Sequence, residues 1–223
     1  MSVGAYQLQN KAKVHKCPCY SEVFSILARL PDSIYLDAGC FTGVDARRVV
    51  QDGWPAGQVW AVDSNPQWSE LGWQLFQDKD ETRVQFINSD LLAADPLSVS
   101  AAGLNPNSTD GCKIRAISAF ALFHLFSQER QVRLALTLWN LLDHTPGSII
   151  FGIQKGMANS TQRDVPVSKE GQDVYFCHSP MSWKALWNRH LDGRVEVRAQ
   201  LAKSEQSPQA GQMYDMFWSV VVV

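Results

Sequence analysis

The chain has 223 residues, of which 45% are hydrophobic and 19% are charged, and its formal net charge is −2. This length suits one domain that buries roughly 70% of its unfolded surface, so no disulfide or metal is needed for stability. The chain is too apolar to be disordered. Its near-neutral charge excludes a broad electrostatic attraction to nucleic acid or to an anionic membrane.

Membrane and secretory classes are not supported by the sequence. No stretch approaches the ~20 consecutive apolar residues of a membrane span, and residues 1–10 lack a basic region followed by an apolar run. The five cysteines form no C-x-x-C pair, so we expect reduced thiols in a cytoplasmic protein. Cys17-Pro18-Cys19 suggests a metal or redox role, but the usual ligand spacing and a second ligand cluster are missing, and we predict no metal site.

Strands and helices alternate along most of the chain. Residues 1–20 are polar and aperiodic, and residues 22–30 have an apolar helical pattern that ends at Pro31. Further helices are predicted at 45–52, 67–77, 128–142 and 180–191. Strands are predicted at 33–37, 58–63, 83–90, 113–119, 148–154, 194–201 and 213–222.

The alternation predicts an α/β fold with a Rossmann-like, doubly wound, seven-stranded sheet. No helix lies between the last two strands, so they should pair antiparallel and make the sheet mostly parallel with an antiparallel C-terminal strand. We assign residues 1–30 to an N-terminal arm and helix. Residues 31–223 form a single domain, with a loop at 96–111 and a long, irregular loop at about 155–178 that is a candidate substrate lid.

A glycine-containing turn and three acids at successive strand ends, Asp37, Asp63 and Asp90, indicate a nucleoside site. Gly39 and Gly43 lie between the first strand and a helix, where a ligand can approach backbone N–H groups. Asp63 ends the next strand, 24 residues after Gly39 (63 − 39), where a carboxylate binds a ribose diol. Asp90 ends the third strand and can face an adenine amino group. Because the carboxyl ends of parallel strands meet at one crevice, these side chains should lie together.

The charges around the turn favour one nucleoside cofactor over another. Asp37 precedes the turn and Asp45 follows it, and two carboxylates beside a diphosphate at about 5 Å would cost a few kcal/mol. The full G-x-G-x-x-G of dinucleotide-binding folds is also missing. S-adenosylmethionine has an ammonium group and a sulfonium and no phosphate, so the acids favour it over NAD.

The pattern D-x-G-C-x-x-G-x-D-x-R resembles the first motif of small class I methyltransferases. It is read here as Asp37, Gly39, Cys40, Gly43, Asp45 and Arg47. Within that superfamily the chain is most similar to fungal enzymes that methylate terpenoid and polyketide intermediates. Residues 70–80, 124–126 and 146–152 carry the same resemblance, which covers roughly residues 30–190, whereas residues 64–68 are less charged than the family pattern.

The resemblance implies an S-adenosylmethionine-dependent O-methyltransferase of secondary metabolism and a set of cofactor-binding residues. The methionine end of the cofactor would lie against Asp37, Gly39, Cys40, Gly43 and Asp45. The rest of the cofactor would lie against Asp63 and Ser64 at the ribose, Asp90 and Leu91 at the adenine, and Ser118, Ala119 and Phe120 at the sulfonium.

The acceptor is less well defined by the sequence. His124 follows the fourth strand and could deprotonate a hydroxyl, or it could be a structural histidine packed beside Phe123 and Phe126. A carboxylate acceptor would need no base, and transfer would then rest on alignment and desolvation. Trp183 and Trp187 are predicted to lie in the core. We expect a small apolar substrate and either a monomer or a homodimer. The alternatives are an isomerase or cyclase on the same fold and a non-catalytic binding subunit.

Overall fold

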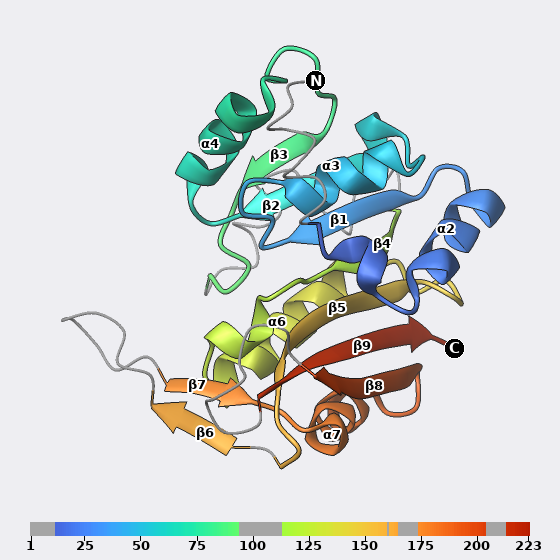
Figure 1. Cartoon of the computed structure of the whole chain (residues 1–223). Helices are drawn as coiled ribbons and strands as arrows, with labels where there is room; N and C mark the ends of the chain where they lie inside the picture. Colours follow the sequence, from blue (N-terminus) through green and yellow to red (C-terminus); the bar gives the residue numbers. More distant parts are fainter. Residues whose placement is uncertain (1–11, 94–112, 160, 165–173, 204–212) are drawn as a thin grey trace.

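The computed structural model describes residues 12–93, 113–159, 161–164, 174–203 and 213–223. Its main element is a seven-stranded sheet with the strand order β3-β2-β1-β4-β5-β9-β8 (Figure 1). The strands of this sheet are β1 Ile34–Ala38, β2 Val59–Asp63, β3 Gln85–Asn88, β4 Ile114–Ser118, β5 Ile149–Gly156, β8 Val195–Lys203 and β9 Tyr214–Val222.

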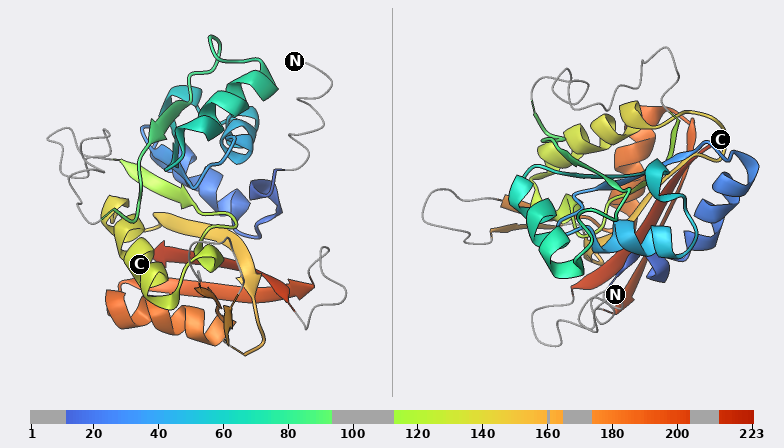
Figure 2. Two further views of the ribbon diagram at one scale, coloured as in Figure 1. Left: turned by 90° about the vertical axis from the view of Figure 1, so that its left-hand side faces the viewer. Right: turned by 90° about the horizontal axis from the view of Figure 1, so that it is seen from above.

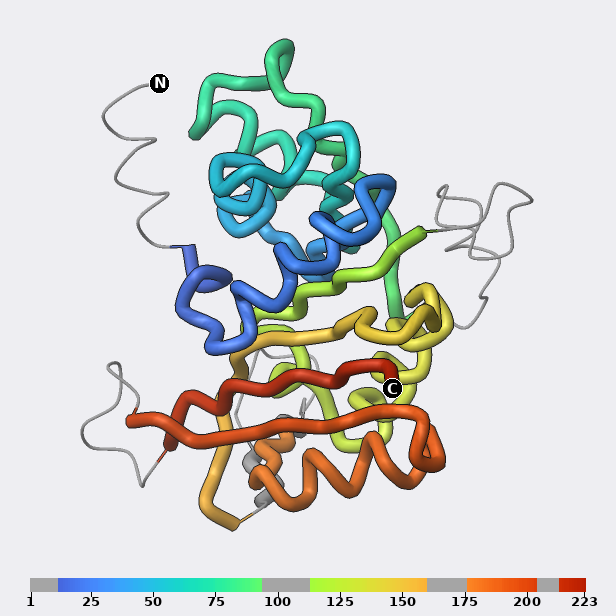
Figure 3. The backbone as a smooth tube through the Cα atoms, turned by 90° about the vertical axis from the view of Figure 1, so that its right-hand side faces the viewer, coloured from blue at the N-terminus to red at the C-terminus, as the bar shows by residue number. Residues whose placement is uncertain are grey.

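The strand directions agree with the sequence prediction. Strands β1 to β5 pair in parallel with their neighbours, and β9 runs antiparallel to both β5 and β8. Figure 3 shows β5, β9 and β8 lying side by side. The predicted seven-stranded, mostly parallel sheet with a reversed C-terminal strand is therefore confirmed.

Helices α4, α6 and α7 begin at a residue whose side chain caps the first turn, whereas α2 and α3 have no such side-chain cap. Asn65 and Ser127 accept a hydrogen bond from the first turn of α4 and α6, and Ser179 forms a capping box on α7. The α-helices are α2 Tyr20–Arg29, α3 Val44–Gln51, α4 Pro66–Phe76, α6 Gln128–Leu141 and α7 Pro180–Leu191. The short 3-10 helices are η1 Val14–Lys16, η2 Ala56–Gln58 and η3 Phe123–Leu125.

Helices cover both faces of the sheet (Figure 2). Helices α6 and α7 pack on one face, where Trp183, Trp187 and Trp218 join the larger hydrophobic core. Helices α2 and α3 pack on the other face, in a second core that includes Tyr35 and Phe151. Trp183 and Trp187 are buried among other rings, so the prediction that they are core residues is confirmed.

The structure differs from the sequence expectation in two segments. The segment 155–178 contains β6 Thr161–Asp164 and β7 Val174–Cys177, which pair antiparallel as a separate two-stranded sheet. The prediction of an irregular loop is therefore wrong where these two strands lie. Residues 12–19 are not a solvated arm, because Val14, Cys17 and Cys19 are buried. Residues 1–11 and the predicted loop at 96–111 lie outside the described residues.

Candidate functional site

The loop after β1 turns sharply at the carboxyl end of the sheet. Gly39 and Gly43 have φ values of 71° and 72°, a backbone conformation that glycine adopts without steric cost. A Cβ atom on Gly39 would lie 2.8 Å from the Leu122 side chain, and one on Gly43 would lie 2.6 Å from the Phe86 ring. Both positions therefore require glycine for the loop to pack as closely as it does.

Three backbone N–H groups of this loop donate hydrogen bonds to other parts of the protein. The N–H groups of Gly39 and Cys40 donate to the Val62 carbonyl at 2.8 and 3.0 Å. The Phe41 N–H donates to Asp63 Oδ2 at 3.0 Å. These bonds fasten the loop to β2, so these three amides do not provide the N–H groups that the sequence suggested for a ligand.

Asp37, in β1, has a buried carboxylate oxygen without a partner. The residue is 2% exposed; its Oδ1 accepts a hydrogen bond from Ser118 Oγ at 2.8 Å, and its Oδ2 has none. Burial, together with the nearby charge of Asp45, raises the pKa of Asp37 to about 7. A cationic ligand in contact with this oxygen would stabilise the ionised carboxylate.

This shift predicts a pH-dependent stability. The pKa of Asp37 is higher in the folded state than the ~3.9 of an unfolded aspartate, so stability falls as the pH rises from about 4 to about 7. We expect Asp37→Asn to raise the free energy of unfolding at pH 8 by roughly 1–2 kcal/mol, after allowance for relaxation around a buried charge. Urea unfolding at pH 5 and pH 8 measures the effect, and an unchanged pH dependence in the variant would contradict it.

Asp45, in the first turn of α3, holds the start of the described chain beside the site. Its Oδ1 accepts hydrogen bonds from the backbone N–H groups of Lys13 at 2.6 Å and Val14 at 2.8 Å. Burial raises the pKa of Asp45, and these two bonds oppose that rise. Part of the hydrogen-bonding capacity of Asp45 is therefore used inside the protein, which the sequence reasoning did not anticipate.

The other two acids are held by local backbone bonds. Asp63 accepts from Phe41 N–H through Oδ2 and from Asn65 N–H at 3.1 Å through Oδ1. Asp90 lies two residues beyond β3, and its Oδ1 accepts from the Leu92 N–H at 2.8 Å. Each carboxylate oxygen has more than one lone pair, so both side chains keep capacity to accept from a ligand.

A cavity of about 650 Å³ adjoins a hollow of about 70 Å³ at this end of the sheet. The predicted residues that line the cavity are Asp37, Gly39, Cys40, Asp45, Asp63, Ser64 and Phe120. Asp90 and Leu91 line the hollow, which shares Gly39, Asp63 and Ser64 with the cavity. The two spaces therefore meet at Asp63, and the structure brings the predicted acids together along them.

Four predicted residues lie outside both linings: Gly43, Ser118, Ala119 and His124. Gly43 supports the loop, and Ser118 donates to Asp37 from behind the cavity wall. Ala119 is fully buried, and its N–H donates to the Phe151 carbonyl. Gly43 and Ser118 thus support the site from the protein interior, whereas Ala119 is buried outside both linings.

His124 lies in η3, half-buried, and its buried Nδ1 has no hydrogen-bond partner. Burial, followed by the positive charges of Lys155 and Lys13, lowers its pKa to about 4. The imidazole is consequently neutral at pH 7 and a weak base.

Arg47 braces the glycine loop, a role that the sequence did not reveal. Its Nε and Nη2 bind the two oxygens of Asp78 at 2.6 and 2.8 Å. Its Nη1 donates to the carbonyls of Thr42 and Gly43 at 2.8 and 3.2 Å. Two features of the sequence could have indicated this ion pair: Arg47 is the last residue of the methyltransferase-like pattern, and Asp78 lies in residues 70–80, a second stretch of resemblance.

The wall of the cavity also carries exposed apolar side chains. Phe41 is 51% exposed, and its ring centroid lies 4.3 Å from that of Trp68. Leu75 and Leu125 are exposed as well, and all four side chains line the cavity. The cavity therefore combines a group of acids with a partly exposed apolar wall.

Neither a cluster of metal ligands nor a membrane-spanning helix is found in the described part of the chain. No group of three or more His, Cys, Asp or Glu side chains there could hold a metal ion. None of the helices in those residues combines the length and apolar character required to cross a bilayer.

The sheet order, the reversed β9 and the position of the cavity define the class I S-adenosylmethionine-dependent methyltransferase fold. A methyltransferase of this type from Methanosarcina mazei superposes with a TM-score of 0.57 at 14% identity, covering 86% of this chain and 93% of that protein. The 1,6-didemethyltoxoflavin-N1-methyltransferase of Burkholderia thailandensis, solved with bound S-adenosylhomocysteine, gives 0.57 at 15% identity over 91% and 77% of the two chains.

Sequence comparison points to fungal proteins. The chain is 32% identical over 172 residues to the O-methyltransferase phiE of a fungal species (strain ATCC 74256), covering 77% of this chain and 53% of that protein. It is 30% identical over 177 residues to the methyltransferase adrK of Penicillium roqueforti, covering 77% and 57%. The resemblance to fungal class I methyltransferases is thus confirmed. No family model matches the chain, and it spans little more than half the length of these curated relatives.

Proposed function

We propose that the protein is an S-adenosylmethionine-dependent O-methyltransferase that acts on a small apolar natural-product intermediate of secondary metabolism. The observation that carries this proposal is the buried, unpartnered Oδ2 of Asp37 in a cavity that Asp63 also lines. A cationic, phosphate-free nucleoside would satisfy that oxygen, whereas a diphosphate would be repelled by the same acids. The names of the fungal relatives support the same reaction class.

The residues present fit the proposed cofactor. Asp37 would accept from the ammonium group, Asp63 would accept from the ribose hydroxyls, and Asp90 with the backbone of Leu91 would hold the adenine in the adjoining hollow. When bound, S-adenosylmethionine supplies an electrophilic methyl group. Phe120 lines the cavity beside these acids and would help to exclude water from the reacting atoms.

The acceptor would be a carboxylate or a hydroxyl on an apolar molecule. The exposed Phe41, Leu75 and Leu125 provide the apolar contact surface. A carboxylate is already ionised, so this chain would only need to orient it and exclude water. For a hydroxyl acceptor we propose His124 as the base, although it lies outside the cavity lining and its lowered pKa makes it a weak one; Lys13, in the lining, would stabilise the resulting anion.

The direct test uses S-adenosylmethionine with an isotope-labelled methyl group. A set of apolar acids and phenols is incubated with the protein, and the products are analysed by mass spectrometry. We expect one acceptor class to gain the label. A product that is isomeric with its substrate and carries no label would instead support an isomerase or cyclase, and no binding of the cofactor by calorimetry would favour a non-catalytic subunit.

The pH profile of turnover is a second test. Because the pKa of His124 is lowered to about 4, its protonation state does not change between pH 6 and pH 9. We expect kcat measured with saturating labelled cofactor to be flat over this range, because the bound cation stabilises the ionised form of Asp37, whose pKa in the unliganded protein is about 7. A fall in kcat centred near pH 6.5 would contradict this. His124→Asn then separates the acceptors, because turnover of a hydroxyl should collapse while turnover of a carboxylate should persist.

We extend the proposal to the binding partners and the cellular location of the protein. We propose a cytoplasmic protein, monomeric or homodimeric, whose partner is a small molecule rather than nucleic acid. Four cysteines of the described residues, Cys17, Cys19, Cys40 and Cys177, are free thiols, as a reducing compartment would maintain them. Analytical ultracentrifugation distinguishes the two assembly states.

A further inference from the structure

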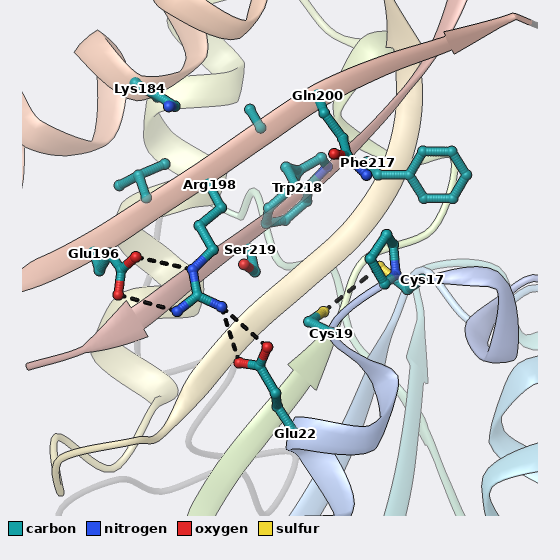
Figure 4. Close-up of a pocket in the computed structure, with 13 residues that line it drawn as sticks. Cys17, Cys19, Glu22, Lys184, Glu196, Arg198, Gln200, Phe217, Trp218 and Ser219 are labelled. Carbon is teal, nitrogen blue, oxygen red and sulfur yellow. Dashed lines mark hydrogen bonds and ion pairs between the residues drawn. The ribbon is translucent and has the colours of Figure 1, made fainter.

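Two cysteines lie together at a second pocket, away from the methyltransferase cavity. Cys17 and Cys19 flank Pro18 between η1 and α2, and their sulfur atoms are 3.6 Å apart. Both line a pocket of about 310 Å³ whose opposite wall is formed by β8 and β9. Figure 4 shows the two thiols facing each other on the side of the sheet to which Phe217 also belongs. The proposed function makes no use of them.

We propose that Cys17 and Cys19 form a modification site, at which a small peroxide converts the dithiol into an intramolecular disulfide. One sulfur attacks the O–O bond of hydrogen peroxide, giving a sulfenic acid and one water. The second sulfur then displaces the hydroxyl group, so that an S–S bond forms and a second water leaves. Two thiols are oxidised and one peroxide is reduced to two waters.

The geometry suits this reaction. The sulfurs must approach from 3.6 Å to a bond length of about 2.05 Å, a short movement for two side chains separated by one residue. The residues are 4% and 6% exposed, so a large oxidant is excluded while a small peroxide can enter through the pocket. The hydrogen bond with Cys19, followed by burial, raises the pKa of Cys17, so this thiol stays protonated until the oxidant reaches it.

The rim of the pocket is polar and open to water. The Arg198 guanidinium pairs with Glu22 at 3.0 Å and with Glu196 at 2.9 Å, and all three side chains are about half exposed. Figure 4 shows these ion pairs across the pocket from the two thiols. A hydrated rim of this kind admits a polar oxidant of the size of water, which supports peroxide as the reagent.

The dithiol is connected to the methyltransferase cavity through one helical turn. The Cys17 N–H donates to the Val14 carbonyl at 3.1 Å, and the Val14 N–H donates to Asp45 at 2.8 Å. The Cys17 thiol also contacts the Gly152 carbonyl of β5 at 3.8 Å, where Figure 3 shows the start of the described chain in dark blue. Closing the disulfide draws Cys17 away from Gly152 and loosens the bonds to Asp45. This step, which rests on the proposed function, should weaken cofactor binding about fivefold.

The test treats the intact protein with hydrogen peroxide, alkylates the remaining thiols and maps the peptides by mass spectrometry. We expect the peptide that contains residues 17–19 to carry no alkyl group and to be lighter than the unmodified dithiol peptide by two hydrogen atoms. Treatment with dithiothreitol before alkylation should restore both thiols. Two alkylatable thiols after peroxide treatment, or stable sulfinic acid without a disulfide, would overturn the proposal.

Variants assign the effect to this pair. Cys17→Ser and Cys19→Ser should each abolish the disulfide, while Cys112→Ser should form it as the wild type does. Because a buried serine can destabilise the protein, Cys17→Ala serves as a second variant with the same expectation. A disulfide that persists in either Cys17 variant would overturn the assignment.

The effect of the disulfide on the cofactor cavity is measured separately. Calorimetry with S-adenosylmethionine should give a dissociation constant about fivefold higher for the oxidised protein than for the reduced one, and hydrogen exchange at the amides of Lys13 and Val14 should be faster. Equal exchange in both forms would overturn the coupling. If the reduced protein fails to bind the cofactor, the proposed function falls, yet thiol mapping and exchange still decide this inference.

Discussion

Replacing Asp78 by alanine should lower the free energy of unfolding by about 3 kcal/mol, since removing one partner of a buried ion pair leaves an uncompensated charge. The Arg47 side chain is 6% exposed and Asp78 accepts two of its hydrogen bonds. The rings of Phe76 and Phe86 lie 4.3 and 5.0 Å from its guanidinium carbon. Water from the pocket beside Asp78 can replace the lost carboxylate only in part, because the Arg47 side chain itself is buried among these groups.

The measurement is chemical unfolding at pH 7, with Asp80→Ala as the matched control. Asp80 is an exposed acid two residues away, so its removal should change the free energy of unfolding by less than about 0.5 kcal/mol. Equal effects of the two substitutions would show that the Arg47 ion pair contributes little. Arg47→Lys should also destabilise the protein, because lysine cannot bind Asp78 through two nitrogens while reaching the Thr42 carbonyl.

The sheet could be predicted because its signal is local. Most of the parallel strands are short apolar runs, and α4, α6 and α7 begin at a side-chain cap, so the alternation indicates the doubly wound fold. The reversed position of β9 follows from the missing helix before it. Boundaries were less accurate: the predicted strand 83–90 is only Gln85–Asn88, the four residues that are in register with Trp60–Asp63 of β2.

Segments whose structure depends on distant contacts could not be predicted. β6 is the polar run TQRD, which the local sequence does not distinguish from a loop, whereas the β-prone run VYFC of β7 was a signal that the interpretation as a loop overlooked. Val14 and Cys17 belong to a polar segment, yet they are buried by the second core and the segment is fastened by Asp45, more than 30 residues further on.

The acids of the site could be predicted because strand ends of a parallel sheet converge, and Asp37 and Asp63 do line one cavity. What these acids bond to within the protein was beyond sequence reasoning. Asp45 accepts from Lys13 and Val14, and Asp78 pairs with Arg47, through contacts that no fixed spacing encodes. The exposed apolar wall was missed for the same reason, since exposure is a property of the packed fold.

Asp63→Ala should weaken the binding of S-adenosylmethionine by about 30-fold, or about 2 kcal/mol, because two hydrogen bonds to a charged carboxylate are lost. Asp63 stands where the cavity and the smaller hollow meet, so its loss affects the ribose and also the junction between the two halves of the cofactor. The substitution also removes the acceptor of the Phe41 N–H, which donates to Asp63 Oδ2 at 3.0 Å in the wild type. Loss of this hydrogen bond should loosen the glycine loop.

Calorimetry of the wild type, Asp63→Ala and Asp63→Asn separates these two contributions. Asparagine can still accept from the Phe41 N–H but carries no charge, so it should preserve the loop and recover only part of the affinity. The control is Asp80→Ala, which alters net charge equally at an exposed position outside both linings. Wild-type affinity in Asp63→Ala would contradict the ribose role, and an equal loss in Asp80→Ala would mean that net charge, and not a bond at Asp63, governs binding.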